Sequence, residues 1–426
     1  MSISKFKNFL QSNTFEKNIF YLSIFLLASA PFISSIIFLF LGIKLTLNNR
    51  NFFADKWNIP FFFSGFLMIC SCLSNTLNKP FFYNQYYDVN LTWIGIFNWI
   101  PYFWVFWVFQ KFSNKAEERY KICIFLLAGS FPVILTCLIQ YFLKVHGPFS
   151  FLQGTITWYL NPIHSYNGMS GLFSNANYTG TWLNIIWPFS LVLFFEKRKY
   201  FLKKLASNFF LFFIVFCTIF TFSRNAILGL IIGLIIILGY KSLKWILPTL
   251  SAISIPIITS IGVIPNQNLI KLSQKIVPEI IWNYRFTSIG IEKLENYGRI
   301  EIWNAAINFI VEKPIWGWGS SSFPILYEAT ANIYKSHTHN LPIELAIGFG
   351  IPVAIVIISS IILLLYFSKE KIFCKKNNNP YDVAWWTSSF LIFISQMFDI
   401  QYYDIRIGFV FWLFLGGLRN MIKNHN

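Results

Sequence analysis

Apolar and polar residues occur in long alternating blocks along this chain. Spanning a bilayer as a helix takes about 20 apolar residues, and twelve apolar runs reach or approach that length. A helix satisfies its own backbone hydrogen bonds, so it is the expected structure for each run. The predicted helices lie near residues 17–30, 31–47, 57–76, 91–112, 121–143, 176–196, 206–222, 225–240, 244–262, 341–367, 382–398 and 405–422.

The longest polar interval, residues 263–340, separates the ninth predicted helix from the tenth. Within it, residues 299–311 (RIEIWNAAINFIV) have the apolar spacing of an amphipathic helix that lies on a membrane or caps a bundle. We therefore expect one integral membrane domain over residues 1–426, with residues 263–340 forming an outer loop that contains short amphipathic helices.

Composition agrees with an all-α, polytopic membrane protein. The chain is 55% hydrophobic and 12% charged, whereas soluble domains are about 25% charged. In a soluble protein the net charge of +17 would suggest nucleic-acid binding. With the N-terminus inside, however, 23 of the 34 Lys and Arg residues fall on cytoplasmic segments, as the positive-inside rule requires. We therefore expect cytoplasmic N- and C-termini and no nucleic-acid partner.

Two arginines on the predicted outer side are candidate anion ligands. Arg224 opens the helix predicted at 225–240, where its guanidinium would add hydrogen-bond donors to the positive end of the helix dipole. Arg299 opens the predicted amphipathic helix. The structural alternatives are an interfacial arginine that snorkels at position 224 and a surface ion pair between Arg299 and Glu301.

Two histidines and an asparagine stand immediately before the tenth predicted helix, in residues 336–340 (SHTHN). The i, i+2 spacing of His337 and His339 suits a loop or an extended segment. His339, beside Asn340, is a candidate general base because imidazole titrates near neutral pH. The alternative is that the histidine only caps the following helix.

We expect no metal and no cofactor. Zinc usually takes Cys, His or carboxylate ligands, but no Cys lies near His337 and His339, and the nearest acids in the sequence are Glu328 and Glu344. The lone turn Gly317–Gly319 lies on the outer side, away from nucleotides, so it is not interpreted as a phosphate-binding loop.

Several short motifs occur in order along the chain: 171–177 (GLFSNAN), 221–224 (TFSR), 298–303 (GRIEIW), 314–319 (PIWGWG), 337–341 (HTHNL) and 348–352 (GFGIP). Together they resemble the O-antigen ligase and polymerase superfamily of bacterial envelope glycosyltransferases. The first 150 residues match this superfamily only in hydropathy.

The resemblance implies a GT-C-like membrane fold of about twelve helices, with a large periplasmic loop between helices 9 and 10, in the bacterial inner membrane. It assigns Arg224 and Arg299 to the lipid diphosphate and His339 to catalysis, while His337 and Asn340 are supporting neighbours. It also implies a metal-independent, inverting transfer of a glycan from an undecaprenyl-diphosphate carrier to a glycolipid or glycan acceptor, such as lipid A core.

Two other functions stay open at this stage. A polysaccharide polymerase would use the same donor and differ only in the acceptor. A small-solute transporter, for example of bicarbonate, belongs to a different class. Ion-coupled carriers place ionisable residues near the bilayer midplane, whereas Glu344, Asp399 and Asp404 fall near the outer ends of predicted helices, which argues against transport.

Overall fold

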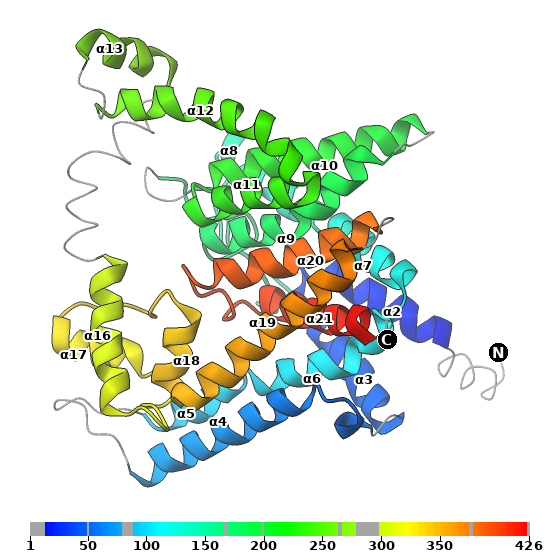
Figure 1. Cartoon of the computed structure of the whole chain (residues 1–426), viewed down its shortest axis with the longest axis vertical. Coiled ribbons are helices and arrows are strands. Elements are labelled where there is room, and N and C mark those ends of the chain that lie inside the picture. Colours follow the sequence, from blue (N-terminus) through cyan, green and yellow to red (C-terminus); the bar gives the residue numbers. More distant parts are fainter. Residues whose placement is uncertain are drawn as a thin grey trace.

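The computed structural model describes residues 13–48, 51–78, 88–164, 168–196, 200–262, 266–277, 298–374 and 378–423. Within these ranges the chain is a bundle of α-helices with one short antiparallel hairpin, in which β1 (Phe149–Phe151) pairs with β2 (Ile156–Trp158). Figure 1 shows the helices of the bundle crossing the molecule side by side, with α16 and α17 at one end.

Each of the twelve apolar segments predicted from the sequence is helical, although three of them are divided into two helices. The helices are α2 (Asn13–Leu26), α3 (Pro31–Asn48), α4 (Ile59–Leu77), α5 (Asn90–Ile96), α6 (Ile100–Val108), α7 (Ala116–Gly129), α8 (Phe131–Phe142), α9 (Ala176–Phe195), α10 (Phe201–Phe220), α11 (Arg224–Leu238), α12 (Leu243–Ser260), α18 (Leu341–Phe349), α19 (Ile351–Phe373), α20 (Pro380–Ser395) and α21 (Ile405–Lys423). Short 3-10 turns, η1 (Phe52–Ala54), η2 (Phe109–Phe112) and η3 (Tyr240–Ser242), flank some of them.

Among the described residues, nine helical segments are long and apolar enough to cross a membrane. The three other predicted segments form the shorter helices α2, α11 and α20, with 14, 15 and 16 residues. A helix of 15 residues spans only about 22 Å, less than the roughly 30 Å of hydrocarbon in a bilayer. The chain is therefore an all-α, multi-pass membrane protein in which some of the predicted spans are short helices.

The centre of the bundle is formed by α9, α20 and α21. Nearly every residue of α21 and most of α9 are buried, and α9 packs against α10, α11 and α20. At the start of α21, Arg406 pairs with Asp404 (Nη2 to Oδ2, 2.5 Å) and lies over the ring of Phe173. Arg406 therefore joins the end of the segment between α20 and α21, which carries part of the candidate site, to Phe173.

The break between α18 and α19 is at Gly350, which has a φ of +94°. A Cβ atom there would overlap the carbonyl oxygen of Ile315, so only glycine fits both the conformation and the close approach. The amide of Ile351 also donates to the carbonyl of Pro314 (2.8 Å). These contacts fix α18 against the segment that follows α16.

Residues 263–340, predicted as an outer loop, contain three helices in their described part: α13 (Gln267–Ile276), α16 (Arg299–Glu312) and α17 (Phe323–Ala331). The last two share a small hydrophobic core with α18. Its buried members are Ile302, Ala306, Phe309, Phe323, Leu326, Tyr327 and Ile347. The amphipathic helix predicted over 299–311 thus corresponds to α16, and it holds the 336–340 segment from one side.

Candidate active site

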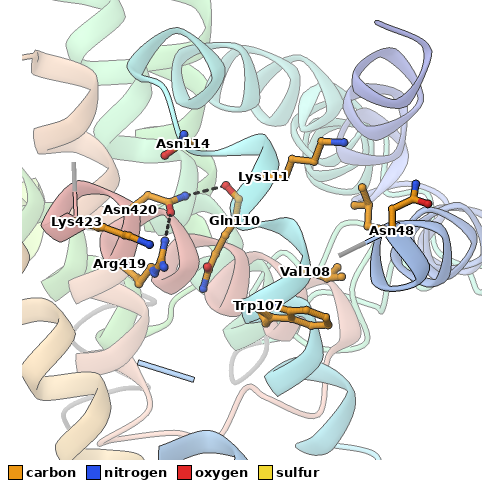
Figure 2. A pocket seen from close by; sticks show the side chains of 10 residues that line it. Asn48, Trp107, Val108, Gln110, Lys111, Asn114, Arg419, Asn420 and Lys423 are labelled. Carbon is orange, nitrogen blue, oxygen red and sulfur yellow. Dashed lines mark hydrogen bonds between the residues drawn. The ribbon is translucent and has the colours of Figure 1, made fainter. Parts of the chain in front are cut away.

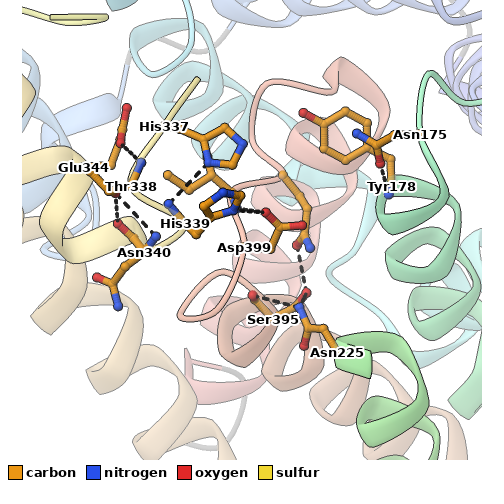
Figure 3. Close-up of polar contacts among 12 residues, drawn as sticks. Asn175, Tyr178, Asn225, His337, Thr338, His339, Asn340, Glu344, Ser395 and Asp399 are labelled. Carbon is orange, nitrogen blue, oxygen red and sulfur yellow. Dashed lines mark hydrogen bonds and ion pairs between the residues drawn. The ribbon is translucent and has the colours of Figure 1, made fainter. Parts of the chain in front are cut away.

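The 336–340 segment is held in place by its own asparagine. Asn340 caps α18, because its Oδ1 accepts a hydrogen bond from the amide of Ile343 (3.1 Å). Its Nδ2 donates to the carbonyl of Met397 (3.0 Å), and the amide of Leu341 donates to the carbonyl of Gln396 (2.9 Å). Residues 336–340, which precede α18, are therefore bonded to the segment that follows α20 (Figure 3).

Further hydrogen bonds fix the peptide on either side of His339. The amide of Thr338 donates to Oε2 of the buried Glu344 (2.9 Å), and Trp303 of α16 donates from Nε1 to the carbonyl of Thr338 (2.9 Å). His339 itself has a φ of +57°, in the left-handed region that is uncommon for a non-glycine residue. A strained position held by this many bonds is typical of a functional side chain.

The imidazole of His339 bonds to a carboxylate from a distant part of the sequence. Its Nδ1 lies 2.9 Å from Oδ1 of Asp399, which is almost fully buried and also accepts from the amide of Ile400 (3.0 Å). A carboxylate oxygen accepts, so Nδ1 carries a proton, and in the neutral ring Nε2 is then an acceptor. This pair has the arrangement of an oriented general base.

The second histidine lies against the first. The amide of His339 donates to Nδ1 of His337 (3.3 Å), and the two ring centroids are 4.2 Å apart. Burial, followed by the positive charge that His339 would carry, lowers the pKa of His337 to about 4. His337 is therefore neutral at pH 7 and adds no charge to the site.

This lowered pKa predicts an acid-sensitive contribution to stability. The unfolded chain takes up a proton at His337 near pH 6.5, but the folded protein does so only near pH 4. Stability should therefore fall as the pH falls between these values, by about 2 kcal/mol at pH 5. His337→Asn keeps a hydrogen-bond acceptor but does not titrate, so its melting temperature in detergent should drop less between pH 7 and pH 5 than that of the wild type. His146→Asn, at an exposed histidine, should behave as the wild type. Equal drops in all three proteins would contradict the assignment.

The structure places both predicted arginines at helix N-termini. Arg224 is the first residue of α11, whose cap, Ser223, accepts from the amide of Ala226 (3.4 Å). Arg299 is the first residue of α16 and follows Gly298. Both side chains are accessible, so each presents a guanidinium at the positive end of a helix dipole.

The two arginines act on one another and on the histidine cluster. Partial desolvation lowers the pKa of Arg299, while the negative charge of Asp399 raises it and the positive charge of Arg224 lowers it. The start of α11 is also bonded to the end of α20, because Nδ2 of Asn225 donates to Oγ (2.7 Å) and to the carbonyl (3.0 Å) of Ser395. The charges of Arg224 and Asp399 thus both act on Arg299, and Asp399 is bonded to His339.

Asp399 is the site residue that sequence reasoning missed. Its position near an outer helix end was noted only as an argument against transport. Its partner, His339, lies 60 positions earlier in the chain, and no local sequence motif indicates that the two residues pair. The acid closest in sequence, Glu344, instead bonds to the backbone of Thr338.

Three side chains of this cluster could hold a metal ion. Ligand atoms of His337, His339 and Asp399 all lie within 4.8 Å of one another. The sequence predicts no metal, because no Cys lies near the histidines and the nearest acids are Glu328 and Glu344. The fold brings Asp399 to them from the segment after α20. Two imidazoles and a carboxylate are a donor set that zinc accepts.

Residues 209–358 match the O-antigen ligase family model. A comparison with curated proteins found no match. The matched segment contains both arginines and the whole 336–340 segment, and it ends before Asp399.

Proposed function

We propose that this chain, whose residues 209–358 match the O-antigen ligase family model, is a membrane glycosyltransferase that moves a glycan from an undecaprenyl-diphosphate carrier to an acceptor hydroxyl. The observation that carries this proposal is the oriented pair of His339 and Asp399; the charges of Asp399 and Arg224 both act on Arg299. A base beside two cations matches a reaction that removes a proton from one partner and releases an anion from the other.

In the proposed reaction His339 activates the acceptor. With Nδ1 donating to Asp399, Nε2 accepts the hydroxyl proton as the acceptor oxygen bonds to the anomeric carbon. Asp399 stabilises the imidazolium that forms and holds the ring in the required tautomer. General-base catalysis of this kind contributes about 10²- to 10⁴-fold to the rate.

The arginines act on the other side of the anomeric carbon. As the new bond to the acceptor oxygen forms, the bond to the diphosphate oxygen breaks, and the electron pair leaves with undecaprenyl diphosphate. Arg224 and Arg299 bind this diphosphate and stabilise the charge that gathers on its leaving oxygen. A single displacement inverts the anomeric centre, and the protein's contribution needs no metal.

We place this chemistry at the periplasmic face of the bacterial inner membrane, with both termini in the cytoplasm. The distribution of Lys and Arg supports this orientation. The acceptor is a glycolipid or glycan, with lipid A core as the ligase-type case. A polymerase would differ only in taking a second lipid-linked repeat as acceptor.

Transfer by the purified protein tests the proposal. In liposomes containing an undecaprenyl-diphosphate-linked glycan and lipid A core, we expect glycosylated lipid A core and free undecaprenyl diphosphate, detected by mass spectrometry. The rate should be unchanged by EDTA. Elongated polyprenyl-linked chains would identify a polymerase instead. A rate that EDTA abolishes and Zn²⁺ restores would reassign His337, His339 and Asp399 to metal binding. Absence of both products would contradict glycan transfer.

A further inference from the structure

A polar cavity of about 540 Å³ lies at the end of the bundle opposite to the histidine cluster. It is lined by side chains from the last turns of α3 and α21 and from the segment around η2 (Figure 2). The candidate active site adjoins the start of α21, and this cavity adjoins its end, about 27 Å away along a 19-residue helix. Nothing in the proposed transfer reaction uses it.

The cavity is basic and presents hydrogen-bond donors that lack acceptors. Lys111, Arg419 and Lys423 line it, and none of the described lining residues is Asp or Glu. Arg419 is only 8% exposed; it pairs with Asp55 and donates from Nη1 to Asn420 (2.8 Å). Its Nε has no hydrogen-bond partner among the described residues.

Nearby acids neutralise this charge only in part. Glu16 binds both Lys44 (3.0 Å) and Lys111 (2.8 Å), so one carboxylate is shared by two cations, and Asp55 pairs with Arg419. The amide Nε2 of Gln110, which also lines the cavity, likewise has no partner within the described chain. A buried donor without an acceptor destabilises the protein, and more so when it is charged. An anion in the cavity would accept from these groups.

A second, apolar groove of about 730 Å³ adjoins this cavity. Trp107 lines both, and the rest of the groove consists almost entirely of apolar side chains from α3, η1, α4 and α6. Phe62 and Phe66 of the groove are 53% and 55% exposed, on helices long and apolar enough to span a membrane. A basic cavity that continues into an open apolar groove matches a ligand with an anionic head and a hydrocarbon tail.

We propose that the cavity and groove together bind one anionic phospholipid, from the leaflet at this end of the bundle. Its phosphate accepts hydrogen bonds from Arg419 and Gln110 and pairs with Lys111 and Lys423, while an acyl chain lies along the groove past Trp107. A free phosphate ion would satisfy the same donors but would leave the groove empty. The site is independent of the proposed glycan transfer.

Native mass spectrometry of the detergent-purified protein tests this site. We expect one phosphatidylglycerol to bind at least tenfold more tightly than phosphatidylcholine. The double variant Lys111→Gln/Lys423→Gln should lose that preference, because it removes two of the cations that attract the lipid phosphate. Glu16 keeps Lys44 as a partner in this variant, so folding should be preserved.

Two controls keep the result specific. Lys121→Gln removes a cation that pairs with Glu117 and lies outside the cavity, so it should retain the preference for phosphatidylglycerol. Inorganic phosphate at the same concentration should not displace the bound lipid. Equal binding of the two lipids, an unchanged preference in the double variant, or displacement by inorganic phosphate would each overturn the proposal.

Discussion

Replacing His339 with asparagine should lower the turnover number for glycan transfer by about 10²- to 10⁴-fold, the range that a general base contributes. Asparagine tolerates the left-handed backbone at this position better than most residues. Its amide can also donate to Asp399 as Nδ1 does, so the segment should keep its structure. What the variant lacks is an acceptor equivalent to Nε2. The measurement is single-turnover transfer in liposomes, with the melting temperature and membrane insertion determined in parallel.

The matched control for this variant is His146→Asn, which makes the same change at an exposed histidine outside the cluster and should transfer at the wild-type rate. A His339→Asn protein that is inserted, folded and fully active would remove the base from the mechanism. A slow variant that also melts much earlier would indicate a structural role for His339 instead.

Asp399 acts through His339 and is a positioning residue. Asp399→Asn should slow transfer less than His339→Asn does. Both rates are measured in the same single-turnover assay. A wild-type rate in Asp399→Asn would contradict the positioning role.

Much of the fold follows from the sequence because a bilayer restricts the available structures. An apolar run of bilayer length must satisfy its backbone internally, so each predicted segment is helical. Local signals also located both arginines: the apolar run after Arg224 and the apolar spacing after Arg299 predict helices that begin there, as α11 and α16 do. These signals lie within a few residues of the positions they predict.

Features that depend on contacts between distant segments were beyond this reasoning. The division of the 341–367 segment depends on Gly350 meeting the backbone at Ile315, and neither residue marks the contact by itself. The pairing of His339 with Asp399 likewise requires the loop after α20 to lie against the N-terminus of α18. The acid nearest to His339 in sequence, Glu344, bonds to the backbone of Thr338 and to the hydroxyl of Tyr403 instead.

The second large effect is expected at the two arginines. Arg224→Gln and Arg299→Gln should each reduce transfer about 10- to 100-fold, because a hydrogen bond to a charged group is worth about 1.5–3 kcal/mol. Each variant should also weaken inhibition by added undecaprenyl diphosphate. Lysine at either position should recover part of the loss, since it restores the charge but not the two-pronged geometry. Initial transfer rates and inhibition constants in liposomes measure both effects.

The double variant distinguishes one shared diphosphate site from two separate roles. The positive charge of Arg224 lowers the pKa of Arg299, so the two cations repel one another unless an anion lies between them. If both hold the same diphosphate, the effects of the two replacements should not multiply, because the first loss already displaces the anion from the second arginine. Independent effects whose product equals the loss in the double variant would place the arginines on different parts of the substrate. Lys271→Gln, at an exposed cation of α13, is the control and should change neither the transfer rate nor the inhibition constant. Wild-type activity in both single arginine variants would contradict the diphosphate assignment.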